Sequence, residues 1–254
     1  VMVLHSNIVA NCLAMEKRFG KDNLKVGCSW LPLFHDMGLI SLLWAIYVGF
    51  PTVFFPSEQF IRNPLIWLKI ISKYRASFSP APNFAYDLCV QKARNLDSAE
   101  NLDIDLSNWK IALNGAEPVR EHTLREFIDT FKKNGFDNRA CYPAYGMAEA
   151  TVFIAGPKPC SLLKTLDSDI RNSLVSSKLA SCGYVADDHQ LLIVNPKGKQ
   201  SLKDGEVGEI WVSGPSITDG YWNKPKATEE TFKAYLSNGE GPYLRTGDLG
   251  LLQD

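Results

Sequence analysis

In the stretch Tyr142-Pro143-Ala144-Tyr145-Gly146-Met147-Ala148-Glu149-Ala150-Thr151, an apolar run enters a glycine turn that is followed by a carboxylate. A second stretch, Tyr243-Leu244-Arg245-Thr246-Gly247-Asp248-Leu249-Gly250, places another carboxylate in a polar turn far downstream. Gly and Asp favour turns, and glycine lets backbone approach a ligand closely. A protein that binds a nucleoside triphosphate through Mg²⁺ and holds its ribose needs both kinds of group.

Around the first stretch, residues 1–157 alternate short apolar runs with amphipathic helical patterns. This alternation is typical of an α/β fold in which helices cover a parallel sheet, and ligands of such sheets bind at the carboxyl ends of the strands. The first residues, Val1 to His5, have the pattern of a strand already in progress. The further predicted strands cover 26–33, 52–55, 76–79, 110–113 and 139–142, and the predicted helices cover 8–19, 37–48 (apolar on all sides and therefore buried), 64–74, 83–93 and 120–134.

The pattern changes after residue 157. Residues 158–182 are polar and weakly periodic, which predicts a long connection or insertion. Residues 183–254 contain short strands separated by Gly and Pro turns, which predicts a small distorted β-barrel or curled sheet with one helix near 227–236. We therefore expect an α/β unit over 1–157, an insertion over 158–182 and a barrel-like unit over 183–254.

Composition excludes several classes of protein. The net charge is −1 and there is no basic run, so a nucleic-acid partner is not expected. No apolar stretch reaches the roughly 20 residues that a membrane-spanning helix needs. The six cysteines are scattered and form no C-x-x-C pair, which favours reduced core residues and a cytoplasmic protein over disulfides or a zinc site.

Each candidate motif also has a purely structural interpretation. Asn114-Gly115-Ala116-Glu117-Pro118 offers bare backbone on which a flat base can lie, or is a plain strand–helix turn. Glu149 can hold a metal, or is favoured by the dipole of a helix that begins there. The segment Thr246 to Asp248 can bind sugar hydroxyls, or merely ends a strand. His35 follows a predicted strand beside Trp30 and Phe34, where a histidine is more often a satisfied core group. The glycine-flanked run from Gly205 to Gly214 and the Gly220–Asn223 turn favour a structural hairpin.

Together, the order and spacing of these motifs resemble the adenylate-forming superfamily of acyl-CoA synthetases, luciferases and peptide-synthetase adenylation domains. The resemblance covers nearly the whole chain and is closest to the fatty acyl-AMP ligases. Most superfamily members have Thr where this chain has Ala148, but that branch accepts Ala. The motifs that carry the resemblance are Ser-Trp-Leu-Pro-Leu-Phe-His-Asp-Met-Gly (29–38), Pro82 to Cys89, Asn114 to Val119, Tyr145 to Thr151, Val207 to Tyr221 and Leu244 to Asp248.

The resemblance implies a role for each motif. Adenine would lie against Gly115, Ala116, Glu117 and the turn Tyr145-Gly146-Met147-Ala148, and Asp248 would bind the ribose. Glu149 would hold Mg²⁺ and, with His35, act in catalysis. Trp30, Phe34 and Asn114 would contact the substrate.

The implied reaction uses ATP and Mg²⁺ to convert a fatty acid to acyl-AMP and pyrophosphate. The implied partner is an acyl carrier protein or a polyketide or peptide synthase module. The stretch near 160–181 resembles the insertion of this branch, which is thought to disfavour CoA. A fatty acyl-CoA ligase and a non-catalytic nucleotide- or acyl-AMP-binding module remain alternatives. We expect residues 1–20 to end a preceding α/β subdomain, the phosphate loop to precede Val1 and a C-terminal domain to follow Asp254, so that this stretch alone is inactive.

Overall fold

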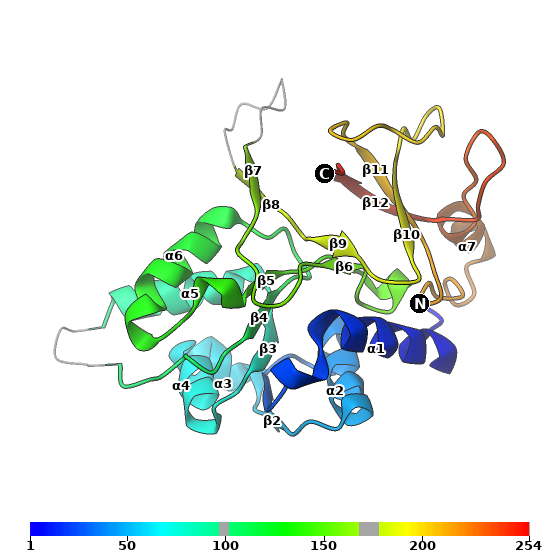
Figure 1. The fold of residues 1–254 in the computed structure, drawn as a ribbon. Coiled ribbons are helices and arrows are strands. Elements are labelled where there is room, and N and C mark those ends of the chain that lie inside the picture. The colour runs from blue at the N-terminus through cyan, green and yellow to red at the C-terminus, as the bar shows by residue number, and fades with distance from the viewer. Residues whose placement is uncertain (97–101, 168–177, 254) are drawn as a thin grey trace.

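The structure is a computed structural model that describes residues 1–96, 102–167 and 178–253. A five-stranded parallel sheet, in the order β2-β1-β3-β4-β5, forms its centre (Figure 1). The parallel α/β fold predicted from the alternating pattern is therefore confirmed. The five strands are β1 (Gly27–Ser29), β2 (Thr52–Phe54), β3 (Phe78–Ala81), β4 (Ile111–Asn114) and β5 (Cys141–Pro143).

Helices connect and cover these strands. The chain passes from β1 to β2 in one direction across the sheet, and then from β2 to β3, β4 and β5 in the opposite direction. Because crossovers between parallel strands are right-handed, this reversal places α2 on one face of the sheet and α4, α5 and α6 on the other. The helix contacts agree, since α1 packs on α2 while α5 contacts both α4 and α6. The helices of this part are α1 (His5–Phe19), α2 (Asp36–Val48), α3 (Ser57–Arg62), α4 (Leu65–Tyr74), α5 (Asn83–Arg94) and α6 (Glu121–Phe131).

Aromatic side chains fill both layers. Phe19 of α1 packs against Trp44 of α2 and against Tyr142 of β5, at ring-centroid distances of 5.0 and 4.9 Å. On the other side Trp109 packs edge-on against Trp67, at 5.2 Å. Side chains of this size dominate the apolar area that a core removes from water, so they fix how the helices lie on the sheet.

The remaining strands form a lobe beside the sheet (Figure 1). Its described strands pair as a three-stranded antiparallel sheet, β10-β11-β12, and as two two-stranded sheets, β6-β9 and β7-β8; no pairing among these described strands closes a barrel. The described part of the predicted insertion over 158–182 contains β7 and β8; residues 168–177 lie outside the described residues. The elements are β6 (Ala155–Gly156), β7 (Thr165–Asp167), β8 (Lys178–Ala180), β9 (Tyr184–Val185), β10 (Gln190–Val194), β11 (Gly208–Ser213), α7 (Pro225–Phe232) and β12 (Leu244–Gly250).

Several element predictions were wrong in detail. No strand is assigned to Val1–His5; Met2 exchanges backbone hydrogen bonds with Gly220 and Asp219, and α1 begins at His5. The strand predicted over 26–33 is only Gly27–Ser29 long, and α3 was not predicted. The predicted buried helix, α2, leaves Leu39, Ile46 and Tyr47 exposed, because a helix that covers a sheet buries one face and its uniformly apolar sequence does not reveal which.

Two further properties bear on the sequence predictions. None of the described helices is long and apolar enough to cross a membrane. Cys12, Cys28, Cys89 and Cys141 are buried and unbonded, as predicted. Cys160 is also free but exposed, so it does not belong to the core.

Candidate functional site

The glycine turn after β5 is fixed by its own backbone. Tyr145 exchanges backbone hydrogen bonds with Ala155 across a short bridge. A Cβ at Gly146 would overlap the carbonyl oxygen of Val152, so only glycine fits there. The prediction that Glu149 begins a helix was wrong, because Ala148–Ala150 is a single 3₁₀ turn that ends at Thr151. Stabilisation by a helix dipole therefore does not explain Glu149.

Asp248 is tied to this turn. The hydroxyl of Tyr145 donates a hydrogen bond to Asp248 Oδ2 at 2.7 Å, across 103 positions of sequence. Burial, and then the neighbouring carboxylate, raise the pKa of Tyr145 well above its usual value, so its phenol stays protonated and remains the donor. Asp248 itself is exposed, and its carboxylate is accessible to a ligand.

Glu149 is held by the segment before α7. Tyr221 donates to Glu149 Oε1 at 2.7 Å, and Thr218 donates to the Glu149 carbonyl oxygen through both its backbone and its hydroxyl group. Burial and the bond to Glu149 raise the pKa of Tyr221 to about 12. The side chains of Tyr145, Met147 and Tyr221 pack on one apolar cluster with Phe232 and Leu244. Both acids are thus hydrogen-bonded to tyrosines that share a single small core.

The strand that carries Asp248 is anchored by an ion pair. Thr246-Gly247-Asp248 is not a turn that ends a strand, as one interpretation predicted, but part of β12, where the pairing with β11 shifts between Glu209 and Trp211. Gly247 has φ +75°, which favours glycine. Arg245 donates to Glu209, with Nη2 at 2.9 Å from Oε2, and Glu209 also accepts the Gly247 backbone N–H.

Glu209→Gln should therefore lower the free energy of unfolding at neutral pH. Burial is the largest single influence and raises the pKa of the Glu209 carboxyl, but the hydrogen bonds and charge of Arg245, together with the Gly247 N–H, outweigh it in sum and hold the pKa below the usual 4.5. The stabilisation is present above pH 4.5 and is lost as the pH falls through the lower pKa of the folded state. We expect a loss of about 1–3 kcal/mol at pH 7 that shrinks in acid, measured by urea unfolding. The exposed Glu230→Gln is the matched control; an equal loss there would contradict this role for the buried acid.

The segment after β4 provides both flat backbone and polar groups. A Cβ at Gly115 would lie 3.1 Å from the Ala144 carbonyl oxygen, and Ala116 adopts φ +65°, a conformation that non-glycine residues rarely hold without a reason. Asn114 is fully buried, and its Oδ1 has no partner among the described residues. Glu117 Oε1 accepts the Phe84 backbone N–H at 2.6 Å, so this acid caps α5.

The residues predicted to contact substrate do not lie in one environment. Trp30 is buried and stacks on Phe60 with a centroid distance of 3.9 Å. Phe34 is 85% exposed and contacts the exposed His35 ring at 4.9 Å, just before α2. Met147 is half-buried in the cluster beside Tyr221. Trp30 therefore lies in the core, apart from the Phe34–His35 pair.

Sequence reasoning missed two asparagines of α1. Asn7 donates to the carbonyl oxygens of Pro215 and Ile217, and Asn11 exchanges hydrogen bonds with the backbone of Phe153 at 2.9 and 3.1 Å. Both are buried, and they lie one turn apart on the face that carries Met15. Two polar residues at this spacing on an apolar helix face could have indicated buried hydrogen bonds, because a buried polar group needs a partner. Tyr221 was missed because its stretch was interpreted as a hairpin turn.

Asn11→Ala should destabilise the chain by about 1–3 kcal/mol, because it leaves the buried N–H and C=O of Phe153 unpaired. Denaturant unfolding measures this directly. The exposed Asn138→Ala should change the unfolding midpoint little. Equal effects of the two substitutions would show that the Asn11 bonds contribute no net stability.

Comparison with known proteins agrees with this geometry. The family model described as AMP-binding enzyme matches residues 1–222. The medium-chain-fatty-acid–[acyl-carrier-protein] ligase JamA of Moorena producens is 38% identical over 270 residues, which covers 100% of this chain and 45% of that protein. The long-chain-fatty-acid–AMP ligase FadD26 of Mycobacterium tuberculosis is 35% identical over 276 residues, covering 100% and 47%.

Solved structures give the same result. The crystal structure of a fatty acyl-adenylate ligase from L. pneumophila, in complex with acyl adenylate and pyrophosphate, matches with a TM-score of 0.91 and 39% identity, over 100% of this chain and 46% of that one. The chain belongs to the AMP-binding enzyme family of adenylate-forming ligases. The predicted resemblance to the fatty acyl-AMP ligases is confirmed by these relatives, of whose length the chain spans about half.

Proposed function

We propose that the protein containing this chain uses ATP to convert a fatty acid to acyl-AMP and pyrophosphate, and then transfers the acyl group to an acyl carrier protein. The observation that carries the proposal is the convergence of Glu149 and Asp248. Each acid is bonded to a tyrosine, and the two tyrosines pack on one cluster. Two acids at one site give separate contacts for the phosphate end and the sugar end of one nucleotide.

The residues that would hold the adenosine are those that the strand ends bring together. Gly115 and Ala116 offer backbone for the adenine, with the Tyr145 ring of the turn as its partner and Asn114 Oδ1 as a buried acceptor. Gly146, Met147 and Ala148 form the rest of the turn. Asp248 has one oxygen bonded to Tyr145 and would accept bonds from the ribose hydroxyls through its carboxylate. Glu117 caps α5 and would contribute mainly by shaping the segment.

The donor set fits Mg²⁺ only as an ion bound together with substrate. No group of three metal-ligating side chains exists within residues 1–96, 102–167 and 178–253. Mg²⁺ in nucleotide sites needs one or two carboxylates plus phosphate oxygens, and Glu149 keeps Oε2 without a hydrogen bond in the described part of the chain. When bound, Mg²⁺ would neutralise phosphate charge. Glu149 would orient it, and Tyr221 would hold Glu149.

The reaction has a simple balance. A carboxylate oxygen of the fatty acid attacks the α-phosphorus of ATP, the bond from that phosphorus to the bridging oxygen breaks, and pyrophosphate leaves. Two anions must approach each other, so electrostatic stabilisation dominates the catalysis. In the second step a phosphopantetheine thiol attacks the acyl carbonyl and AMP leaves. His35 lies exposed at the start of α2, where it would contact the reacting phosphate or carboxylate, with Phe34 beside it and Trp30 five positions earlier as the apolar residues that would contact the substrate.

Fatty acid as the substrate class is supported by the relatives, which are named as medium-chain and long-chain fatty-acid ligases. ATP–pyrophosphate exchange in the full-length protein tests it. Exchange should depend on a fatty acid, and exchange supported only by amino acids would overturn this substrate class.

The carrier protein as acceptor is supported by the name of JamA. The test compares thioester formation with holo-acyl carrier protein and with CoA. Transfer to the carrier alone is expected, and deletion of roughly residues 164–178 should raise the CoA product if this insertion disfavours CoA. CoA thioester as the main product of the undeleted protein would identify an acyl-CoA ligase instead.

We also propose the division of the chain into an α/β unit over 1–157, an insertion over 158–182 and a second unit over 183–254. The large apolar cluster, built almost wholly from residues before 157, supports the α/β unit, and the cluster built from residues 192–243 supports the second unit, while the remaining cluster joins residues 145–155 to residues 191–244. Calorimetric titration with ATP separates this enzyme from a non-catalytic binding module. A module binds ATP without any exchange activity in the full-length protein.

A further inference from the structure

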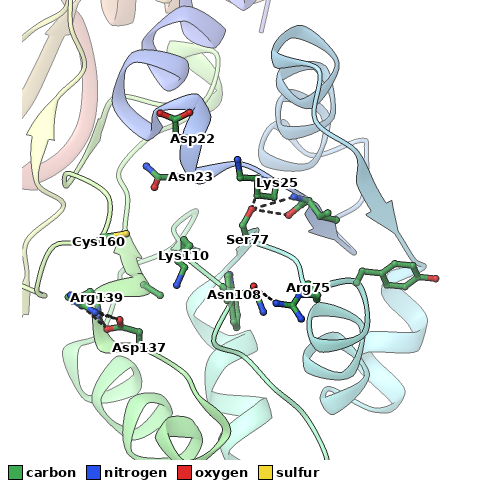
Figure 2. A pocket seen from close by; sticks show the side chains of 14 residues that line it. Asp22, Asn23, Lys25, Arg75, Ser77, Asn108, Lys110, Asp137, Arg139 and Cys160 are labelled. Carbon is green, nitrogen blue, oxygen red and sulfur yellow. Dashed lines mark hydrogen bonds and ion pairs between the residues drawn. The ribbon is translucent and has the colours of Figure 1, made fainter.

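A second, separate site is built at the opposite edge of the parallel sheet. A cavity of about 580 Å³ lies beyond the amino ends of β1, β3, β4 and β5 (Figure 2), whereas Asn114 and Tyr145 follow the carboxyl ends of β4 and β5. Its volume is within the usual range of small-molecule sites. Nothing in the proposed reaction uses this cavity.

The cavity is ringed by cations in a repeated position. Each of the four loops that enter a strand here carries one cation, one to three residues before the strand: Lys25 before β1, Arg75 before β3, Lys110 before β4 and Arg139 before β5. Parallel strands share one amino edge, so this placement gathers the four charges around one space. In the view of Figure 2 the Lys110 side chain lies between Arg139 and Arg75.

Three of these four cations make no ion pair with any described residue, although Asp137 lies near Lys110 and Asp105 lies near Arg75. Among the described residues only Arg139 has an ion pair, with Asp137. Lys110 donates to the Ser107 carbonyl oxygen at 2.8 Å and Arg75 to Asn108 Oδ1 at 3.3 Å, which are neutral acceptors. The Lys25 side chain has no hydrogen-bond or ion-pair partner in the described part of the chain and is exposed. Cations outnumber the lining carboxylates, Asp22 and Asp137, by four to two.

Arg75 adds an independent observation. It ends α4 with φ +52°, the left-handed position that glycine normally occupies at a helix end. An arginine there costs backbone strain that a glycine would avoid. A cation at a helix end is also favoured by the helix dipole, but Lys25 and Lys110 lead directly into strands and have no such explanation.

We propose that this cavity binds a small molecule bearing a phosphate or pyrophosphate group. Four cations that line one cavity favour a polyvalent anion there, since guanidinium groups match phosphate oxygens in pairs and lysine serves as a point charge. Val26, which is half-buried, provides apolar surface for the remainder of the ligand. The site would be occupied independently of the nucleotide site, because it opens at the other edge of the sheet.

Calorimetric titration of the full-length protein with pyrophosphate, and separately with inorganic phosphate, tests this proposal at low ionic strength. We expect saturable binding that weakens as salt is added, and that Lys25→Glu and Lys110→Glu each weaken by about tenfold or more. Both side chains are exposed, so the variants should fold, which circular dichroism checks. Lys226→Glu, on the exposed surface of α7, makes the same charge change away from the cavity and should leave the affinity within about twofold.

Amide NMR spectra then locate the bound anion. Shifts on pyrophosphate addition at residues 22–26, 74–77, 107–110 and 137–140 would support the proposal. Shifts confined to 145–151 and 246–249 would assign the binding to the nucleotide site and overturn it. Absence of saturable binding at millimolar concentration, or an equal loss in Lys226→Glu, would overturn it as well.

Discussion

Glu149→Gln should lower kcat/KM for adenylation ~30- to 1,000-fold, which corresponds to an activation free energy higher by about 2–4 kcal/mol. The reason is that it removes one electrostatic stabiliser of the reacting phosphates. The amide keeps the size of the side chain and can still accept the bond from Tyr221, so the turn should keep its shape. The measurement is pyrophosphate exchange in the full-length protein over a range of Mg²⁺ concentrations. The loss should be largest where Mg²⁺ is limiting.

Tyr221→Phe is the matched control for that experiment. It removes the hydrogen bond to Glu149 Oε1 but keeps the carboxylate, so its effect should be smaller and should not depend strongly on Mg²⁺. If Glu149→Gln turns over like the unchanged protein at limiting Mg²⁺, Glu149 has no role in holding the metal.

Asp248→Ala should weaken the binding of ATP by about 2–4 kcal/mol, which appears as a higher KM for ATP. The reason is that two hydrogen bonds to a charged acceptor would be lost. The ribose lies away from the reacting phosphorus, so kcat should change less than KM. Steady-state kinetics with varied ATP separates the two parameters. Tyr145→Phe, which keeps Asp248 but removes its 2.7 Å donor, should show a smaller change.

A double-mutant cycle makes the second test specific for the sugar. The unchanged protein should lose affinity when 2′,3′-dideoxy-ATP replaces ATP, whereas Asp248→Ala should show no further loss. If the dideoxy nucleotide weakens binding equally in both proteins, Asp248 does not bind the ribose hydroxyls.

The sequence predicted the central sheet because its signals are local. Apolar runs between helical patterns marked the strands, and the glycines that directly follow three of the helical patterns, Gly20, Gly49 and Gly135, have the positive φ that is common where a helix ends. The ends of the strands were predicted less accurately than their positions. The strand before His35 is three residues long because Pro32 and the turn after it leave the sheet, although the apolar run continues to Leu33.

The site was harder to predict because its contacts are distant in sequence. The bond from Tyr145 to Asp248 spans 103 positions and the bond from Tyr221 to Glu149 spans 72. No local pattern reveals such pairs, and only the resemblance to a family brought the two acids together beforehand. Glu117 has a contact that no local pattern indicated, since its Oε1 accepts the Phe84 N–H at the start of α5; its role toward adenine stays a prediction.

The buried amides of α1 have a thermodynamic consequence. Asn11 is hydrogen-bonded to the segment after the glycine turn, and Asn7 is hydrogen-bonded to the segment between β11 and α7. One helix is therefore bonded to both halves of the molecule. Detaching α1 would break both sets of bonds together. The sheet and its neighbouring lobe should consequently melt in one transition, and amide hydrogen exchange should report a common opening energy for residues 150–153 and 216–217.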